Sequence, residues 1–274
     1  MSRTKIWLLA AGALVLAGCI LFAGTLAAQG WDVTKLSTVS FETNTHEIKE
    51  DFRDIAVTTD TANIAFAVSD DDTCRVVCCE AENANHAVSV TDQTLVIASE
   101  GRHTWRDDIG FSLGTPQLTV YLPQTQYRAL TIDGSTRNVE IPKEFAFDRA
   151  EITLSTGNAD VAASISETAK IATTTGNIRV ENTSVGALTL SVTTGAAEVS
   201  GVRCQNELTL GVTTGAARLR DVSCESFAST GSVGSIALEN VLAAGEISIE
   251  RTTGHVEFTA CDAEELHVPR TRAL

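Results

Sequence analysis

Thr174-Thr-Gly-Asn-Ile-Arg-Val180 returns nineteen residues later as Thr193-Thr-Gly-Ala-Ala-Glu-Val199, and this repetition decides the fold. The same frame occurs six times between residues 155 and 258, and its glycines are 19 or 20 residues apart. These structural repeat glycines are Gly157, Gly176, Gly195, Gly215, Gly234 and Gly254. A period this regular is typical of a solenoid, in which each repeat forms one coil.

Apolar residues alternate inside each repeat, which indicates strands with one face turned inward. Examples are the pair Ile178 and Val180 after the glycine, and the pair Leu188 and Leu190 in the second strand of a repeat. Six residues after the glycine stand residues that favour turns, namely Asn182, Gly201, Asp221 and Asn240. The pattern predicts an all-β chain with a right-handed parallel β-solenoid over residues 133–268, at about 19 to 20 residues per coil.

Upstream of the regular repeats, the sequence is rich in strand-forming residues but its turn signals are irregular. We expect residues 51–132 to form less regular coils or a β cap that covers the first edge of the solenoid. Residues 32–50 are polar and show no clear period, so they are predicted to be a juxtamembrane linker.

Residues 6–31 contain no charged side chain and follow Arg3 and Lys5. At about 1.5 Å per residue, such a helix is long enough to cross a hydrocarbon core of about 30 Å. Positively charged residues favour the cytoplasmic side, so residues 1–5 are predicted to be a cytoplasmic leader and the bulk of the chain to be extracytoplasmic. This predicts a single-pass protein of the cytoplasmic membrane.

Two alternatives remain for the amino terminus, a cleaved signal peptide and a lipoprotein. The tetrad Leu16-Ala-Gly-Cys19 resembles a lipobox, which would make Cys19 a lipidation site. The residues after Cys19 are apolar, however, where lipoproteins usually turn polar.

The charge balance argues against a nucleic-acid partner. There are 20 Lys and Arg against 35 Asp and Glu, for a formal net charge of −15, and no basic stripe. Binding to a phosphate backbone depends mainly on clustered cations.

Stacked threonines beside the glycines form a column, at Thr156, Thr175, Thr194, Thr214 and Thr253. Such a column can be a hydroxyl surface that contacts ice or glycans. It can equally reflect the suitability of Thr for strand edges next to a glycine corner, and we favour this second interpretation.

The ectodomain has six cysteines. Cys204 and Cys224 should stack on adjacent coils, where a disulfide is one possibility outside the cell. We favour buried thiols, because parallel stacking at about 4.8 Å is wider than the Cβ separation of about 3.8 Å in a disulfide. The sequence does not give the connectivity of the six cysteines. In the stretch Cys74 to Cys79, Cys74 and Cys78 share a face while Cys79 points away, so they do not form a CxxC metal clip.

No metal, catalytic or cofactor-binding site is predicted. Asp70, Asp71 and Asp72 lack the glycine-rich nonapeptide of calcium β-rolls. The five histidines are scattered without ligand spacing, at positions His46, His86, His103, His255 and His267. An outward column alternates in sign and suits salt bridges between coils rather than an acid and base pair; it comprises Asp160, Arg179, Glu198, Arg218, Ala237 and Glu257.

Several stretches together resemble the bacterial putative-adhesin family of β-strand repeat proteins, a membrane-anchored family classed as a domain of unknown function. They are Gly30-Trp-Asp, Thr43-Asn-Thr-His-Glu-Ile, Thr119-Val-Tyr-Leu-Pro, Val139-Glu-Ile-Pro-Lys-Glu-Phe and the Thr-Gly coils. The resemblance covers nearly all of residues 40–268. It implies a β-solenoid ectodomain of the bacterial cell envelope, and the family supplies no catalytic motif.

The carboxyl terminus departs from this family, whose members usually continue through further coils. We expect residues 269–274 to be an irregular tail of a truncated chain. The last coil would then be incompletely capped and could pair with the edge of another chain.

These features predict a non-enzymatic module for adhesion, scaffolding or envelope sensing. Its partners would be the membrane, through the amino-terminal helix, and an unidentified envelope glycan or protein. Two alternatives remain open: a glycan-active β-helix enzyme, and an accessory subunit of a membrane sensor or transporter.

Overall fold

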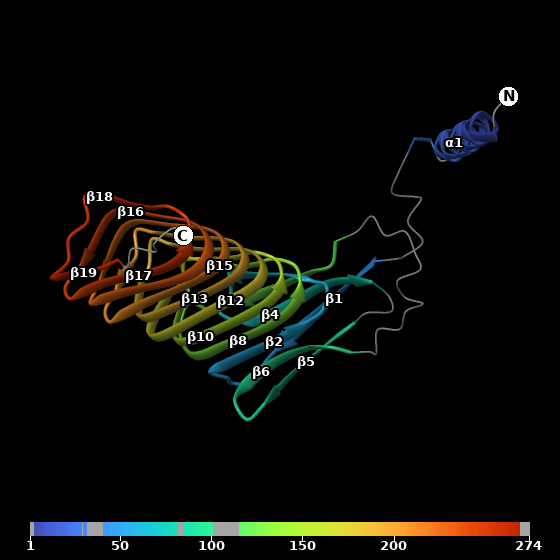
Figure 1. Ribbon diagram of the computed structural model, residues 1–274. Coiled ribbons are helices and arrows are strands. Elements are labelled where there is room, and N and C mark those ends of the chain that lie inside the picture. Colours follow the sequence, from blue (N-terminus) through green and yellow to red (C-terminus); the bar gives the residue numbers. More distant parts are fainter. Residues whose placement is uncertain (1–2, 29, 32–40, 82–84, 101–114, 269–274) are drawn as a thin grey trace.

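The computed structural model describes residues 3–28, 30–31, 41–81, 85–100 and 115–268. Strands make up 69% of it and form a β-solenoid of about seven turns (Figure 1). The predicted solenoid and the predicted apolar helix at the amino terminus are both confirmed.

Helix α1 spans Arg3–Ala28. Within it, Trp7–Ala28 is long and apolar enough to cross a membrane, judged by length and composition. The helix ends earlier than residue 31, because Gly30 takes a left-handed conformation with φ of 72°. The Gly30 amide donates to Ala27 O at 3.1 Å and the Trp31 amide to Leu26 O at 2.8 Å. These two bonds form a Schellman motif, which satisfies carbonyls at the end of a helix.

The regular coils stack to form two walls of parallel strands, and the two walls meet at a corner. The first wall runs through β8 (Gln126–Thr136), β10 (Ala146–Thr156), β12 (Ser164–Glu181), β13 (Ser184–Ser200), β15 (Glu207–Cys224), β16 (Ser226–Ala243), β17 (Glu246–Thr253) and β19 (Glu265–His267). The second wall contains β9 (Val139–Ile141), β11 (Ala159–Val161), the later halves of β12, β13, β15 and β16, and β18 (Val256–Thr259). The short strand β14 (Arg203–Cys204) lies between β13 and β15.

Equivalent residues of successive coils lie side by side, so each inward position becomes a column of the core. Ile171, Leu190 and Leu210 pair in register and are buried. The interior forms one continuous apolar cluster from Ile55 to Ile249. Because one coil buries too few side chains to be stable alone, this shared core explains why the coil is repeated.

The first layers of the stack do not follow the order of the sequence. Strand β2 (Asp54–Thr59) lies between β6 (Thr94–Ser99) and β8, with both pairings parallel. Strand β3 (Asn63–Val68) likewise lies between β7 (Gln117–Leu122) and β9. The coil nearest the amino terminus is therefore covered by a layer that comes later in the chain.

Antiparallel strands, which we call the cap, cover the outer side of that layer. Strand β4 (Cys74–Ala81) pairs with β7 and with β1 (Phe41–Ile48), and β5 (His86–Thr91) pairs with β6. Strand β1 falls inside residues 32–50, for which the sequence predicts a linker. It is polar because it is an edge strand whose side chains are all at least partly exposed.

The repeat glycines lie at the corner between the two walls, with φ between 138° and 149°. A Cβ added at any of them would lie 1.7 to 1.9 Å from a backbone carbonyl oxygen of the preceding coil. Arg137 occupies the equivalent corner one coil earlier, with φ of 135°. The frame Ser135-Thr-Arg-Asn-Val-Glu-Ile thus continues the repeat, and it escapes a search for glycine because Arg137 replaces it.

The turn residues expected six positions after the glycine also take positive φ. The values are 50°, 62°, 53° and 54° at Asn182, Gly201, Asp221 and Asn240 respectively.

The predicted tail, residues 269–274, lies outside the described residues. Within the described part of the chain, β19 pairs only with β17, and Leu266 is 58% exposed. Self-association through this edge stays a prediction.

Replacing Gly195 by Ala should destabilise the solenoid severely, because a Cβ there would lie 1.8 Å from Gly176 O. The disfavoured backbone conformation alone costs roughly 1 to 3 kcal/mol, and the clash adds to it. In Gly211→Ala the new Cβ would meet its nearest atom at 3.7 Å, so this control should change the free energy of unfolding by less than about 1 kcal/mol. Chemical denaturation measures both, and equal destabilisation would contradict the role of the corner.

Candidate functional site

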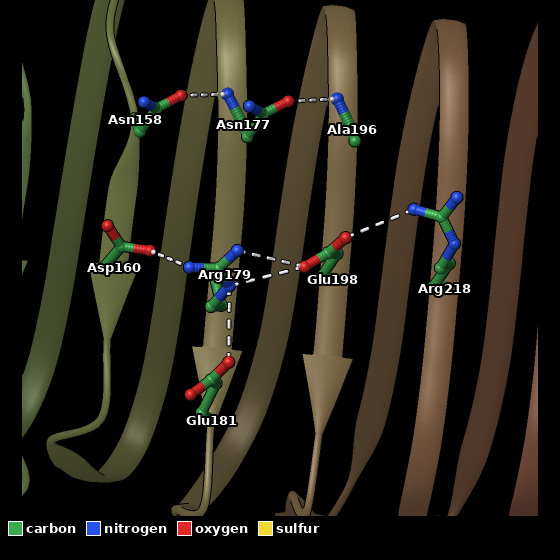
Figure 2. A network of polar contacts seen from close by, with 8 residues as sticks. All are labelled: Asn158, Asp160, Asn177, Arg179, Glu181, Ala196, Glu198 and Arg218. Atoms are coloured by element: carbon green, nitrogen blue, oxygen red, sulfur yellow. Dashed lines mark hydrogen bonds and ion pairs between the residues drawn. The ribbon is translucent and has the colours of Figure 1, made fainter.

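A column of alternating charges runs across the second wall, one residue from each coil (Figure 2). Arg179 on β12 contacts Asp160 on β11 at 3.4 Å and Glu198 on β13 at 3.3 Å. Glu198 also contacts Arg218 on β15 at 3.2 Å, and Arg179 contacts Glu181 on its own strand at 3.3 Å. The structure therefore forms the bridges between coils that the alternation predicts.

The ion pairs of the charge column give the surface its charge pattern but contribute little to the free energy of unfolding. Its side chains are roughly half exposed, and exposed pairs are worth at most about 1 kcal/mol each. The network ends at Arg218, because the next residue in register is Ala237, followed by Glu257. These carboxylates are paired with cations along the strand stack, which differs from an acid and base facing each other across a cleft.

Asparagines form a second column beside the first. The Oδ1 atoms of Asn138, Asn158 and Asn177 each accept a hydrogen bond at 2.9 Å from the backbone amide of the next coil (Figure 2 shows the last two). The ladder ends at Ala196, which carries no side-chain acceptor. These residues satisfy backbone donors next to the glycine corner, so their role is structural.

The threonine column lies in register and is exposed. Thr156, Thr175, Thr194 and Thr214 pair across successive coils, and Val233 then interrupts the column before Thr253. The position before each of them is also exposed and carries a hydroxyl in Ser155, Thr174, Thr193, Thr213, Ser232 and Thr252. The corner therefore presents hydroxyl groups along the length of the regular coils.

A groove of about 530 Å³ opens beside this hydroxyl corner. It is lined by Ser191, Gly211, Val212, Thr213, Thr230, Gly231, Ser232, Glu250, Arg251 and Thr252. Arg251 occupies a column in which earlier coils place the buried residues Val192 and Val212, and Gly231 leaves space for its guanidinium. Its Nη2 donates to Ser229 Oγ at 3.3 Å.

Arg251 is thus a partly buried cation at a polar opening. Burial lowers its pKa from the ordinary arginine value. Arginine nevertheless remains charged at neutral pH. The sequence analysis did not single out Arg251. Aligning the coils in register would have shown it, because Arg251 then falls in a column that holds Val192 and Val212 in earlier coils.

A second groove, of about 540 Å³, adjoins the charge column. Charged residues dominate its lining: Glu140, Lys143, Glu144, Asp160, Arg179 and Glu181. Two of its carboxylates, those of Asp160 and Glu181, contact Arg179.

A buried polar cluster lies in the cap. His86 Nδ1 is 2.7 Å from Glu80 Oε2, and His86 Nε2 is 2.9 Å from Thr59 Oγ1. Glu80 Oε1 accepts from Asn44 Nδ2 at 2.9 Å. The order of hydroxyl, imidazole and carboxylate is that of a hydrolase triad, but Thr59 is 3% exposed and substrates cannot reach it. Sequence spacing missed this cluster because its members come from four strands.

The three aspartates Asp70, Asp71 and Asp72, for which the sequence predicts no calcium site, lie in a turn. Asp71 Oδ1 accepts from Ser69 Oγ at 2.7 Å and from Thr73 Oγ1 at 2.8 Å, and these bonds lower the pKa of Asp71. Asp72 has φ of 55°. Among the remaining histidines, His255 and His267 are exposed, and His103 lies outside the described residues.

All seven cysteines carry free thiols. Cys74 and Cys78 are buried on one face of β4 and Cys79 is on the other, as predicted. Cys204 and Cys224 are buried on neighbouring coils. Burial raises the pKa of Cys74 and Cys78 to about 12 and that of Cys224 to about 11.

Comparison with known proteins identifies the family. Residues 52–269 match the Toastrack DUF4097 family. This chain belongs to that family. A search among curated proteins finds no match.

Two solved structures are similar to this chain, and the first shares its fold. A putative adhesin from Bacteroides fragilis is 15% identical, with a TM-score of 0.53 over 80% of this chain and 97% of that one. A putative adhesin from Parabacteroides distasonis is 11% identical, with a TM-score of 0.43 over 84% of this chain and 98% of that one. At these identities the similarity concerns the fold alone.

The pKa values predict which thiols react in the folded chain. The thiolate is the reactive form, so the buried thiols of Cys74, Cys78 and Cys224 should resist a maleimide near neutral pH. Cys79 and Cys261, which are partly exposed, should react first. Mass spectrometry of peptides labelled before and after denaturation, in a Cys19→Ser background, measures the order. Equal labelling of all six cysteines in the folded state would contradict the prediction.

Proposed function

We propose that this Toastrack protein is a membrane-anchored, extracytoplasmic β-solenoid that acts as a non-enzymatic module for adhesion, scaffolding or envelope sensing. Helix α1 supplies the anchor, and Arg3 and Lys5 next to it favour a cytoplasmic amino terminus. The observation that carries the proposal is the exposed hydroxyl corner, which is repeated from coil to coil, with the Arg251 groove as a local polar opening beside it.

A repeated surface suits a repeated ligand. Successive coils place equal side chains about 4.8 Å apart, so a polymer with polar groups along its length can contact several coils at once. Each contact is weak, but contacts made by one molecule add up through their high effective concentration. An envelope glycan fits this description, since its hydroxyls can bond to Thr213, Thr230 and Glu250 and its acidic groups to Arg251.

The shared fold supports a role in binding. The similar solved structure from Bacteroides fragilis is described as a putative adhesin. Among the described residues, the carboxylates that line the second groove favour the alternative of a glycan-active enzyme. We place that alternative second because Asp160 and Glu181 are engaged with Arg179.

The proposed topology predicts labelling of Cys261 from outside the cell. In a chain that retains Cys261 as its one cysteine, a membrane-impermeant maleimide should label intact cells as fully as lysed cells. A cysteine-free chain with Ser2→Cys is the control, and it should be labelled only after lysis. The reverse pattern would show that the solenoid is cytoplasmic.

The proposed binding surface predicts that Arg251→Gln weakens retention on purified envelope polysaccharide. Loss of a charge-assisted hydrogen bond of about 1.5 to 3 kcal/mol corresponds to roughly a tenfold or greater fall in affinity. Arg149→Gln removes an equally charged but exposed residue, paired with Glu167 on the first wall, and should bind normally. Co-sedimentation of the detergent-solubilised full chain measures both. Release of soluble sugars from the polysaccharide would instead favour the enzyme.

A further inference from the structure

Three side chains of different metal-binding chemistry converge in the cap. Cys78 and Glu80 lie two residues apart on the buried face of β4, and His86 is the first residue of β5. Their Sγ, carboxylate oxygen and imidazole nitrogen atoms all lie within 4.8 Å of one another. The three residues are 1%, 2% and 8% exposed respectively. We propose that Cys78, Glu80 and His86 form a binding site for a divalent transition metal ion, for which Zn²⁺ fits best.

The donor set selects the class of metal. Ca²⁺ and Mg²⁺ take oxygen ligands almost exclusively, so the thiol of Cys78 excludes them. Zn²⁺ accepts sulfur, imidazole nitrogen and carboxylate oxygen as ligands, at distances of about 2.0 to 2.3 Å in a tetrahedral arrangement. Three protein ligands leave one tetrahedral position for water.

Charge balance favours the same ion. The carboxylate of Glu80 and the thiolate of Cys78 together carry two negative charges, and the imidazole of His86 is neutral as a ligand. One divalent cation makes the buried centre neutral, which removes the large cost of an uncompensated charge in the interior. A cysteine binds a metal as the thiolate, so the Cys78 thiol gives up its proton when the metal binds.

Neighbouring side chains already orient the ligands. Asn44 Nδ2 holds Glu80 Oε1 and directs Oε2 toward His86. Thr59 Oγ1 lies 2.9 Å from His86 Nε2. A hydroxyl can either donate to Nε2 or accept from it, so Thr59 remains a partner when the metal takes Nδ1. Metal-bound histidines typically have such a hydrogen-bond partner at the other ring nitrogen, which fixes the orientation of the ring.

The protons balance in the binding step. The imidazole proton moves from Nδ1 to Nε2, where it is donated to Thr59, and the lone pair on Nδ1 binds the metal. The Cys78 thiol releases its proton to solvent as the sulfur–metal bond forms. Each metal bound therefore releases one proton, and no electron is transferred.

The site would join two separate strands of the cap. Glu80 and Cys78 belong to β4, which pairs with β7, while His86 belongs to β5, which pairs with β6. A metal bound by both strands joins the two antiparallel parts that cover the first coils. The inferred role is structural and does not depend on the proposed adhesive function.

The test uses the full chain in detergent, stripped with a chelator and then given Zn²⁺ or Co²⁺ alone. Elemental analysis after dialysis should find one Zn²⁺ per chain, and Co²⁺ should give the near-ultraviolet charge-transfer absorption of a cobalt thiolate. Cys78→Ala should abolish the absorption and lower Zn²⁺ affinity more than tenfold. Cys74→Ala removes a buried thiol of the same strand outside the cluster and should leave both unchanged. Thr59→Val should weaken binding by about 10-fold to 100-fold.

Several outcomes would overturn the inference. They are an absence of bound Zn²⁺, equal Zn²⁺ binding by Cys78→Ala, and Co²⁺ binding without thiolate absorption. The last two would assign the ion to exposed carboxylates or histidines. Circular dichroism checks that each variant is folded, and if Cys78→Ala is not, the cobalt spectrum of the unaltered chain decides.

Discussion

The close approach of backbones at the glycine corner is the constraint on which the rest of the solenoid depends. Each repeat glycine faces the carbonyl of the corner residue one coil earlier, with no space for a Cβ. It also takes a backbone conformation that other residues avoid. Because a shift of one residue would put a side chain into this contact, the corner fixes the register between coils more firmly than the apolar alternation could alone.

Fixed register turns the sequence of one coil into columns along the whole molecule. Two residues after the glycine a column enters the core, as with Ile178 beside Ala197, and three residues after it a column of charges emerges. The binding surface that we propose depends on the same alignment, because the threonines form a column only when successive coils pair in register. Where a column changes type, as at Arg251, the surface acquires a local feature such as the groove.

This dependence explains how much the sequence could predict. The coils from Gly157 onward could be predicted because neighbours in the stack are also neighbours by repeat, so periodicity gives both strands and contacts. The coil at Arg137 was not included among the glycine corners because the marker residue is absent, although its register is unchanged. The order of β6, β2 and β8 could not be predicted. β6 follows β2 in the chain but pairs with β2 on the side away from β8, and no local sequence pattern indicates this order.

The buried Glu80 and His86 pair was hidden for the same reason. Their partners Asn44 and Thr59 come from β1 and β2, which have no repeat relation to β4 or β5. Regular coils continue by adding equivalent strands, and their cores are almost wholly apolar. The first edge has no equivalent coil to add, so antiparallel strands of unrelated sequence must cover it. Such a junction brings together polar side chains of strands that have no repeat relation, which is why the cap holds this buried polar cluster and the proposed metal site.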